Sequence, residues 1–322
     1  MADVEILREW NGPPPLSGVT IPSAATIKAM CVDISEQQGG YYPMKLAYPP
    51  GEQPTLWIKY GPGVFWDELV NQTRLHQELQ KIDSPVRVPA VYYAFTDSKG
   101  PRWTYIVMEY IRGETVGSLE RKARESQPPE QCRETLEGLH RRVAFVLDEF
   151  LRIPVPAGTP PASISGALIR HPVFGIDQEA PRPYENVEQL EQHFNMFIEL
   201  PGMRRRKLPL LRGLSQEPMV FCHCDVNDGN FMINEMDEIV VLDFGMACIL
   251  PLSFAKYITL TIGHDGLGRA VRPWVHLPDM GGQSCANADV LMGVQGPMIQ
   301  SGSSFDRIMR RVPGCPPPRD IF

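Results

Sequence analysis

The chain has 322 residues and a formal net charge of −7, with 43% hydrophobic and 21% charged residues. These values are ordinary for a folded globular protein, and the acidic balance argues against a nucleic-acid or anionic-membrane surface. The acidic start lacks the apolar core of a secretory signal, and no run approaches the roughly 18 apolar residues that a membrane span needs. Seven cysteines without a CxxC pair are typical of free thiols, so we expect a cytoplasmic protein.

The first third of the chain is predicted to be a sheet that carries a single helix. Residues 1–26 contain the stretch GPPPLSG and are expected to be a low-order lead-in. Short β-rich runs separated by Gly and Pro follow and are expected to be strands: 27–33, 55–60, 88–95 and 103–111. Residues 66–82 carry three leucines at helical spacing and predict the helix.

After residue 113 the apolar spacing becomes that of helices. Residues 130–153 place an apolar side chain every three or four positions, and residues 187–200 repeat the pattern. Strands are expected again at 219–221 and 238–244, on both sides of a polar stretch. The sequence therefore predicts a mixed α and β chain whose later part is mostly helical.

The polar stretch HCDVNDGNFMINEMDEIVVLDFG spans residues 223–245. In it, Asp225 is followed by Asn230 five positions later and by Asp243 a further thirteen positions on. A loop Asp, a loop Asn and an Asp after a strand can converge on one point. This set suits phosphoryl transfer, in which one carboxylate accepts the proton of a hydroxyl, while an amide oxygen and the second carboxylate hold Mg²⁺. The residues alone also permit a simpler interpretation, in which Asp and Asn only cap a turn.

The pattern H-x-D-x(4)-N followed by D-F-G resembles the signature of the protein-kinase-like superfamily. The version here is similar to the aminoglycoside phosphotransferase and choline kinase branch. The resemblance implies that Asp225 is the catalytic base and that Asn230 and Asp243 are metal ligands. Cys224 and Val226 stand where the branch more often has Gly and Leu.

The resemblance also implies an α+β, two-lobed protein-kinase-like fold. Its small β-rich N-lobe is expected over residues 27–111, and its mostly helical C-lobe, with the catalytic and metal loops, over residues 112–260. Lys59, at the end of the strand TLWIKY, resembles the lysine that binds the nucleotide phosphates. Glu68 resembles the glutamate that pairs with this lysine, and Glu78 is the alternative partner.

The run YIVMEYIRG resembles the hinge between the lobes. There the backbone of Glu109, Tyr110 and Ile111 is expected to meet the adenine edge of ATP, with Met108 lining the pocket. No G-x-G-x-x-G is present for the loop over the phosphates, and QQGGYY at 37–42 is the best candidate.

These features predict an ATP- and Mg²⁺-dependent phosphotransferase that moves the γ-phosphoryl group to a hydroxyl of a small molecule. Nucleic acid, a membrane or an obligate protein partner is not expected. A protein kinase is a less favoured alternative, because Cys224 replaces the Arg of H-R-D and no A-P-E follows Asp243. A nucleotide-binding pseudokinase or interaction module with an impaired acceptor site is the other alternative.

The end of the chain supports that last alternative. Residues 261–322 contain no Lys or Glu, but nine glycines and seven prolines, and they keep no apolar helical period. We therefore expect a largely disordered tail that leaves the acceptor side of the site incomplete.

Overall fold

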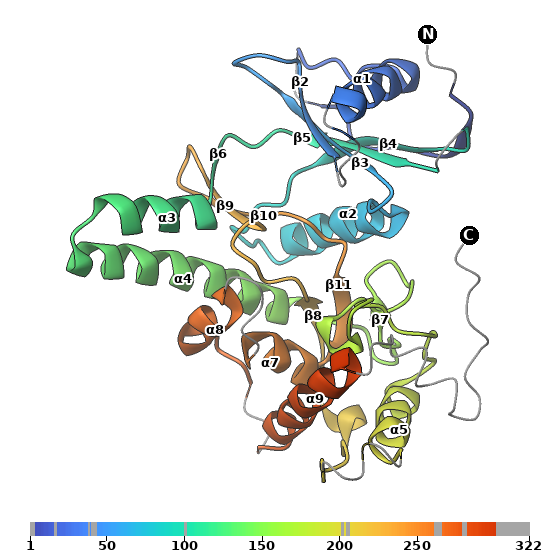
Figure 1. Cartoon of the computed structure of the whole chain (residues 1–322), viewed down its shortest axis with the longest axis vertical. Helices are drawn as coiled ribbons and strands as arrows, with labels where there is room; N and C mark the ends of the chain where they lie inside the picture. The colour runs from blue at the N-terminus through green and yellow to red at the C-terminus, as the bar shows by residue number, and fades with distance from the viewer. Residues whose placement is uncertain are drawn as a thin grey trace.

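The structure is a computed structural model that describes residues 4–15, 18–37, 39, 44–99, 102–200, 203, 207–260, 266–278 and 282–300. A β-rich N-terminal lobe lies above a mostly helical C-terminal lobe (Figure 1). The expected α+β architecture, with a β-rich N-lobe and a mostly helical C-lobe, is thereby confirmed. Over the described ranges, none of the helices combines the length and the apolar character that crossing a membrane requires.

The N-terminal lobe is built on a five-stranded antiparallel sheet in the order β1-β4-β5-β3-β2. Its strands are β1 (Ile6–Asn11), β2 (Met44–Tyr48), β3 (Leu56–Gly61), β4 (Val91–Asp97) and β5 (Thr104–Glu109). Successive side chains of a strand point to opposite faces of a sheet. Each strand of this sheet therefore contributes to two different layers.

Two helices cover the two faces of this sheet, α1 (Ala24–Gln37) and α2 (Trp66–Lys81) (Figure 1). Ile27 and Cys31 of α1 are fully buried in an aromatic-rich cluster on one face. On the other face, Leu69 of α2 packs in a separate cluster with β4 and β5. The α2 face is the one that looks toward the C-terminal lobe, and it carries the candidate site.

Two predictions for the start of the chain are wrong. Residues 1–26 are not simply a low-order lead-in, because β1 pairs with β4 at the edge of the sheet. Residues 27–33 are helical rather than a strand, since they lie inside α1. The two fully buried residues of that run, Ile27 and Cys31, are four positions apart, which is a helical spacing. The run is too short for the sequence to show this period.

The C-terminal lobe consists of helices packed around two small sheets. Its described α-helices are α3 (Val116–Ser126), α4 (Pro129–Arg152), α5 (Val187–Ile198), α7 (Leu252–Leu260), α8 (Leu267–Val271) and α9 (Gln283–Gln300), with 3₁₀ turns η1 (Pro172–Phe174), η2 (Leu214–Gln216) and η3 (Arg272–Trp274). One sheet has the order β10-β9-β6 and the other β7-β11-β8. Their strands are β6 (Gly113–Thr115), β7 (Ala162–Ser163), β8 (Met219–His223), β9 (Phe231–Asn234), β10 (Ile239–Val241) and β11 (Ala247–Pro251).

The expectation of a disordered tail over 261–322 is wrong for residues 266–278 and 282–300. These residues form α8, η3 and α9, and α9 contacts both α7 and η1. Ala288, Leu291 and Val294 of α9 are fully buried. Residues 261–265, 279–281 and 301–322 lie outside the described residues.

The prediction for α9 was wrong because glycine was interpreted as a turn signal, whereas Gly293 serves helix packing. A Cβ added at Gly293 would lie 2.6 Å from a methyl carbon of Leu208, so the glycine lets the two segments approach closely. A close approach of this kind is visible only in three dimensions, whereas in the sequence the same residue resembles a helix breaker.

Candidate active site

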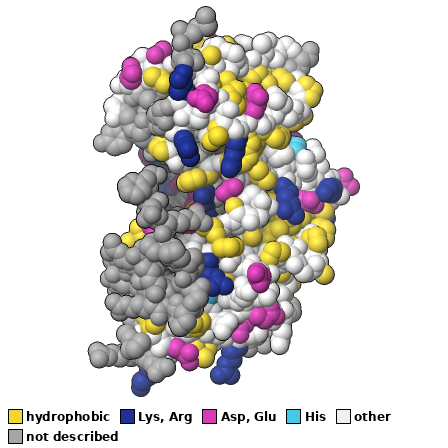
Figure 2. Space-filling model, turned by 90° about the vertical axis from the view of Figure 1, so that its right-hand side faces the viewer, with side chains coloured by type: hydrophobic (Ala, Val, Ile, Leu, Met, Phe, Trp, Pro, Cys, Tyr) yellow, Lys and Arg dark blue, Asp and Glu magenta, His cyan; other side chains and the backbone are white. Residues whose placement is uncertain are grey.

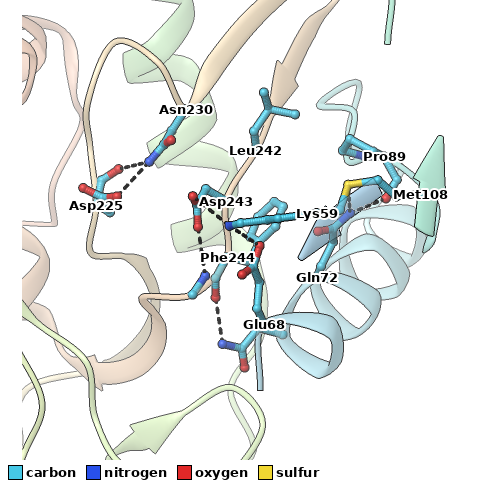
Figure 3. Close-up of polar contacts among 12 residues, drawn as sticks. Lys59, Glu68, Gln72, Pro89, Met108, Asp225, Asn230, Leu242, Asp243 and Phe244 are labelled. Atoms are coloured by element: carbon cyan, nitrogen blue, oxygen red, sulfur yellow. Dashed lines mark hydrogen bonds and ion pairs between the residues drawn. The ribbon is translucent and has the colours of Figure 1, made fainter. Parts of the chain in front are cut away.

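Asp225 and Asn230, the predicted catalytic base and metal ligand, lie between β8 and β9, where the chain leaves one small sheet of the C-terminal lobe for the other. The Nδ2 atom of Asn230 donates to the backbone oxygen and to Oδ2 of Asp225, both at 2.9 Å (Figure 3). The backbone amide of Leu242 donates to the Asn230 backbone oxygen at 2.8 Å, which joins this loop to the segment after β10. The two residues predicted from the motif therefore form one hydrogen-bonded unit.

Lys59 joins the N-terminal lobe to the segment after β10. Its Nζ atom lies 2.7 Å from Oε1 of Glu68 in α2 and 3.0 Å from Oδ2 of Asp243 (Figure 3). The expected Lys59–Glu68 pair is present, whereas Glu78 pairs with Lys81 at 2.8 Å. The side chains of Lys59 and Glu68 are 10% and 3% exposed, but that of Asp243 is 40% exposed and remains open to a ligand.

The charges of this triad shift the pKa values of its members. Burial alone would lower the pKa of Lys59, but the charges of Glu68 and Asp243 and its hydrogen bonds to both raise it above its usual value. Burial would raise the pKa of Asp243, but the charge of Lys59 and its hydrogen bond lower it below the usual range. Burial raises the pKa of Glu68, against the opposing charge of Lys59. Lys59 and Asp243 are therefore held in their charged forms at neutral pH.

The backbone at Asp243 has a φ of 58°, in the left-handed region that few residues other than glycine adopt. Side chains hold the carbonyl groups on either side of it. The Nε2 atom of His223 lies 3.1 Å from the Leu242 oxygen, and Nδ2 of Asn71 donates to the Phe244 oxygen at 2.8 Å. These two contacts fix the direction in which the Asp243 carboxylate points.

A cavity of about 320 Å³ lies between the lobes at this point. Its lining includes Lys59, Glu68, Asn230 and Asp243 from the predicted site. The four predicted hinge residues also line it: Met108, Glu109, Tyr110 and Ile111. Asp225 is not among the lining residues, although Asn230, to which it is bonded, is.

The predicted hinge is hydrogen-bonded to the residues just before β4 and β3. The backbone amide of Glu109 donates to the Ala90 oxygen at 2.8 Å, and the amide of Tyr110 donates to the Thr55 oxygen at 3.1 Å. The Glu109 carboxylate is 2.8 Å from the guanidinium of Arg87, so its side chain is occupied outside the cavity. These contacts occupy the Glu109 side chain and the amides of Glu109 and Tyr110, so contact with a ligand falls to the other backbone groups of the predicted hinge.

Residues that the motif did not indicate also shape the cavity. Gln72 of α2 lines it and donates from Nε2 to the Pro89 oxygen at 2.8 Å and to the Met108 sulfur at 3.7 Å. Lys45 lines it from β2. Gln72 lies one helical turn after Glu68, so its position on the same face of α2 could have been expected from helical spacing. The candidate loop at 37–42 lies mostly outside the described residues.

A sequence profile of the phosphotransferase enzyme family matches residues 66–277, about two thirds of the chain. The chain belongs to this family. The match covers α2, the predicted hinge, the loop that carries Asp225 and Asn230, and Asp243, whereas Lys59 and the strands before it precede the matched region. A comparison with curated protein sequences finds no match.

Solved structures of aminoglycoside phosphotransferases are similar to this member of the phosphotransferase enzyme family. The GDP complex of a variant of aminoglycoside 2'-phosphotransferase-IIIa is 15% identical, with a TM-score of 0.46, over 88% of this chain and 96% of that one. Aminoglycoside phosphotransferase APH(4)-Ia is 12% identical, with a TM-score of 0.46, over 89% and 100%. ADP-bound APH(2'')-Ib is 15% identical, with a TM-score of 0.43, over 81% and 86%. Similarities at this level say nothing about the substrate of this chain.

Proposed function

We propose that this protein transfers the γ-phosphoryl group of ATP to a hydroxyl group of a small molecule. The observation that carries the proposal is the single cavity shared by the Lys59–Glu68–Asp243 triad and by Asn230, the partner of Asp225. A buried lysine and an exposed carboxylate on one cavity, with a loop carboxylate hydrogen-bonded to a residue of its lining, are the groups that phosphoryl transfer needs. Membership of the phosphotransferase enzyme family supports the same reaction class.

Each group has a defined task in this reaction. The acceptor hydroxyl oxygen forms a bond to the γ-phosphorus while the bond from that phosphorus to the β–γ bridging oxygen breaks, which yields a phosphomonoester and ADP. Asp225 takes the hydroxyl proton, a step for which its carboxylate is held in place by Asn230. Lys59 holds the nucleotide phosphates, and the ion pair with Glu68 fixes its direction. The hinge backbone at Glu109–Ile111 meets the adenine edge.

The residues around the cavity also fit Mg²⁺. Because the Asn230 amide nitrogen is bonded to Asp225, its amide oxygen is the atom left for a cation. The exposed Asp243 carboxylate supplies a second hard oxygen donor on the same cavity, and Mg²⁺ prefers such donors. When bound, Mg²⁺ supplies positive charge to the phosphate oxygens.

The acceptor can be sought without assuming its charge. On the face shown in Figure 2, basic and acidic side chains are interspersed, so surface charge there favours neither a cationic nor an anionic acceptor. The test is incubation of the protein with Mg-ATP and a panel of amino-alcohols, sugars and aminoglycosides, followed by mass spectrometry. We expect one class to gain a single phosphate group, and we expect Asp225→Asn to abolish the gain.

A thermal-shift measurement with Mg-ATP, made beside that assay, decides between this proposal and the pseudokinase alternative. Thermal stabilisation by Mg-ATP without turnover on any acceptor would favour a nucleotide-binding module. The argument for an impaired acceptor side depended on disorder over 261–322, and the packed α8 and α9 remove it for residues 266–278 and 282–300. Phosphorylation of generic protein substrates would favour a protein kinase instead.

A further inference from the structure

Two lysines face each other across the strand pair that forms the upper wall of the cavity. Lys45 of β2 is directly opposite Lys59 of β3 in the antiparallel register. Side chains of directly opposite residues lie on the same face of a sheet, and both of these lysines line the cavity. Like charges in this arrangement destabilise a sheet, so the pair is unfavourable unless negative charge lies between or beside its members.

Of the two lysines, only Lys59 forms ion pairs with the carboxylates that line the cavity. Glu68 and Asp243 both pair with Lys59, at 2.7 and 3.0 Å. The third carboxylate on the cavity, Glu109, pairs with Arg87 at 2.8 Å. Lys45 is exposed at the cavity wall, and within the described part of the chain no carboxylate forms an ion pair with it. The positive charge of Lys45 is therefore available to an anionic ligand in the cavity.

We propose that Lys45 is a second phosphate-binding residue, which contacts the phosphates of the bound nucleotide from the β2 side of the cavity. The proposal rests on the proposed function, because it takes ATP as the ligand. A lysine ammonium on a flexible stem donates up to three hydrogen bonds and suits phosphate oxygens. The sequence has no G-x-G-x-x-G whose backbone could contact the phosphates. The Lys45 side chain would supply phosphate contacts in its place.

A comparison of adenosine with ADP isolates the phosphate contact, because the two ligands share base and sugar. Calorimetric titration of the full chain with each ligand is done for the wild type, Lys45→Met, Lys45→Arg and Lys81→Met. We expect Lys45→Met to bind ADP about tenfold more weakly, in line with the loss of a hydrogen bond to a charged group. Adenosine binding should stay within about twofold, since that ligand has no phosphate. Lys45→Arg should restore most of the ADP affinity.

Lys81→Met is the matched control, because Lys81 is also a lysine of the N-terminal lobe but lies in the last turn of α2, 65% exposed and paired with Glu78. It should bind both ligands like the wild type. Equal losses of adenosine and ADP in Lys45→Met would show that the residue shapes the cavity rather than binds phosphate, and would overturn the proposal. Unchanged ADP affinity would overturn it as well. A wild type that binds neither ligand would instead contradict the nucleotide site itself, before any substitution is compared.

Discussion

The side-chain amide of Asn71 in α2 donates to the backbone oxygen of Phe244 at 2.8 Å, and so joins the helix that carries Glu68 to the residue after Asp243. The same side chain accepts hydrogen bonds from the Ser165 amide at 2.7 Å and the Ser163 hydroxyl at 3.0 Å. Asn71 is fully buried, and all of these partners come from other elements. The orientation of α2 and the left-handed backbone at Asp243 are therefore coupled through one side chain.

The first prediction concerns this coupling. Asn71→Leu keeps the size of the side chain but leaves the Phe244 carbonyl without its donor and the Ser165 amide without its acceptor, at a cost of about 1–3 kcal/mol in the free energy of unfolding. Because Asp243 is then less firmly held, we also expect weaker Mg²⁺-dependent binding of ATP. Urea unfolding and Mg²⁺ titrations of ATP binding measure the two effects.

Ser163→Ala is the control for that variant, because it removes a bond to the other end of the same amide. It should lower stability slightly and leave the Mg²⁺ dependence unchanged. If both variants lost Mg²⁺ dependence equally, Asn71 would stabilise the fold without positioning Asp243.

The second prediction separates the roles of the two aspartates. Asp225→Asn keeps an oxygen that can accept the hydrogen bond from Asn230 but cannot take a proton, so transfer should fall by about 10²–10⁴-fold while ATP binding stays nearly intact. Asp243→Asn should weaken Mg-ATP binding as well as transfer. Single-turnover transfer and equilibrium binding, measured on the same preparations, test both. Equal losses of binding in the two variants would show that the roles are assigned wrongly.

The sequence predicted those parts of the structure whose pattern is local. The helices at 66–82 and 130–153 have amphipathic spacing, and α2 and α4 are found there. Edge strand β1 was missed because its side chains are mostly exposed and show no buried alternation. Helix α9 was missed because its glycines suggested turns, whereas Gly293 serves close packing against Leu208. In each missed case the decisive partner is distant in the sequence.

The same distinction applies to the candidate site. Asp225, Asn230 and Asp243 lie in one stretch with a recognisable spacing, so the motif indicates them together. Asn71 acts through contacts with residues at positions 163, 165 and 244, and the sequence gives no sign of those contacts. The role proposed for Lys45 depends on the register that places it opposite Lys59. The sequence did not indicate this role, because strand β2, which carries Lys45, was not predicted.

The third prediction concerns stability at acid pH. Burial lowers the pKa of His171 to about 3, and burial together with the charge of Arg182 does the same for His193. His171 is neutral with a defined tautomer, because its Nδ1 accepts from the Val173 amide at 3.1 Å and its Nε2 then donates to the Phe254 oxygen at 3.3 Å.

The sign of the effect follows from the two states. An unfolded histidine titrates near pH 6.5, so between about pH 6.5 and 3 the unfolded chain binds protons that the folded chain does not. The free energy of unfolding should therefore decrease by about 1.4 kcal/mol, for each of the two residues, with every unit by which the pH is lowered below 6.5. Urea unfolding at pH 7.5, 6 and 5 measures the slope. His171→Asn should flatten it.

The last prediction concerns the C-terminal helix, because its packing bears on whether the acceptor side is complete. Asn287 of α9 is buried, and its Nδ2 donates to the Arg212 oxygen at 2.9 Å and to Oε1 of Glu217 at 2.7 Å. Its Oδ1 accepts from the Arg212 amide at 3.0 Å. Asn287→Ala leaves these groups unsatisfied and should cost about 2–3 kcal/mol in the free energy of unfolding.

Asp289→Ala, on the exposed side of the same helix, should stay within about 0.5 kcal/mol of the wild type. Hydrogen exchange gives an independent measurement, in which the amides of residues 287–294 should be strongly protected in the wild type. In Asn287→Ala that protection should fall first in α9, because the helix loses its polar anchor to the segment around Arg212 while the contacts of Leu291 and Val294 remain. Rapid exchange across 287–294 in the wild type would mean that α9 is not stably packed, and the case for an impaired acceptor side would return.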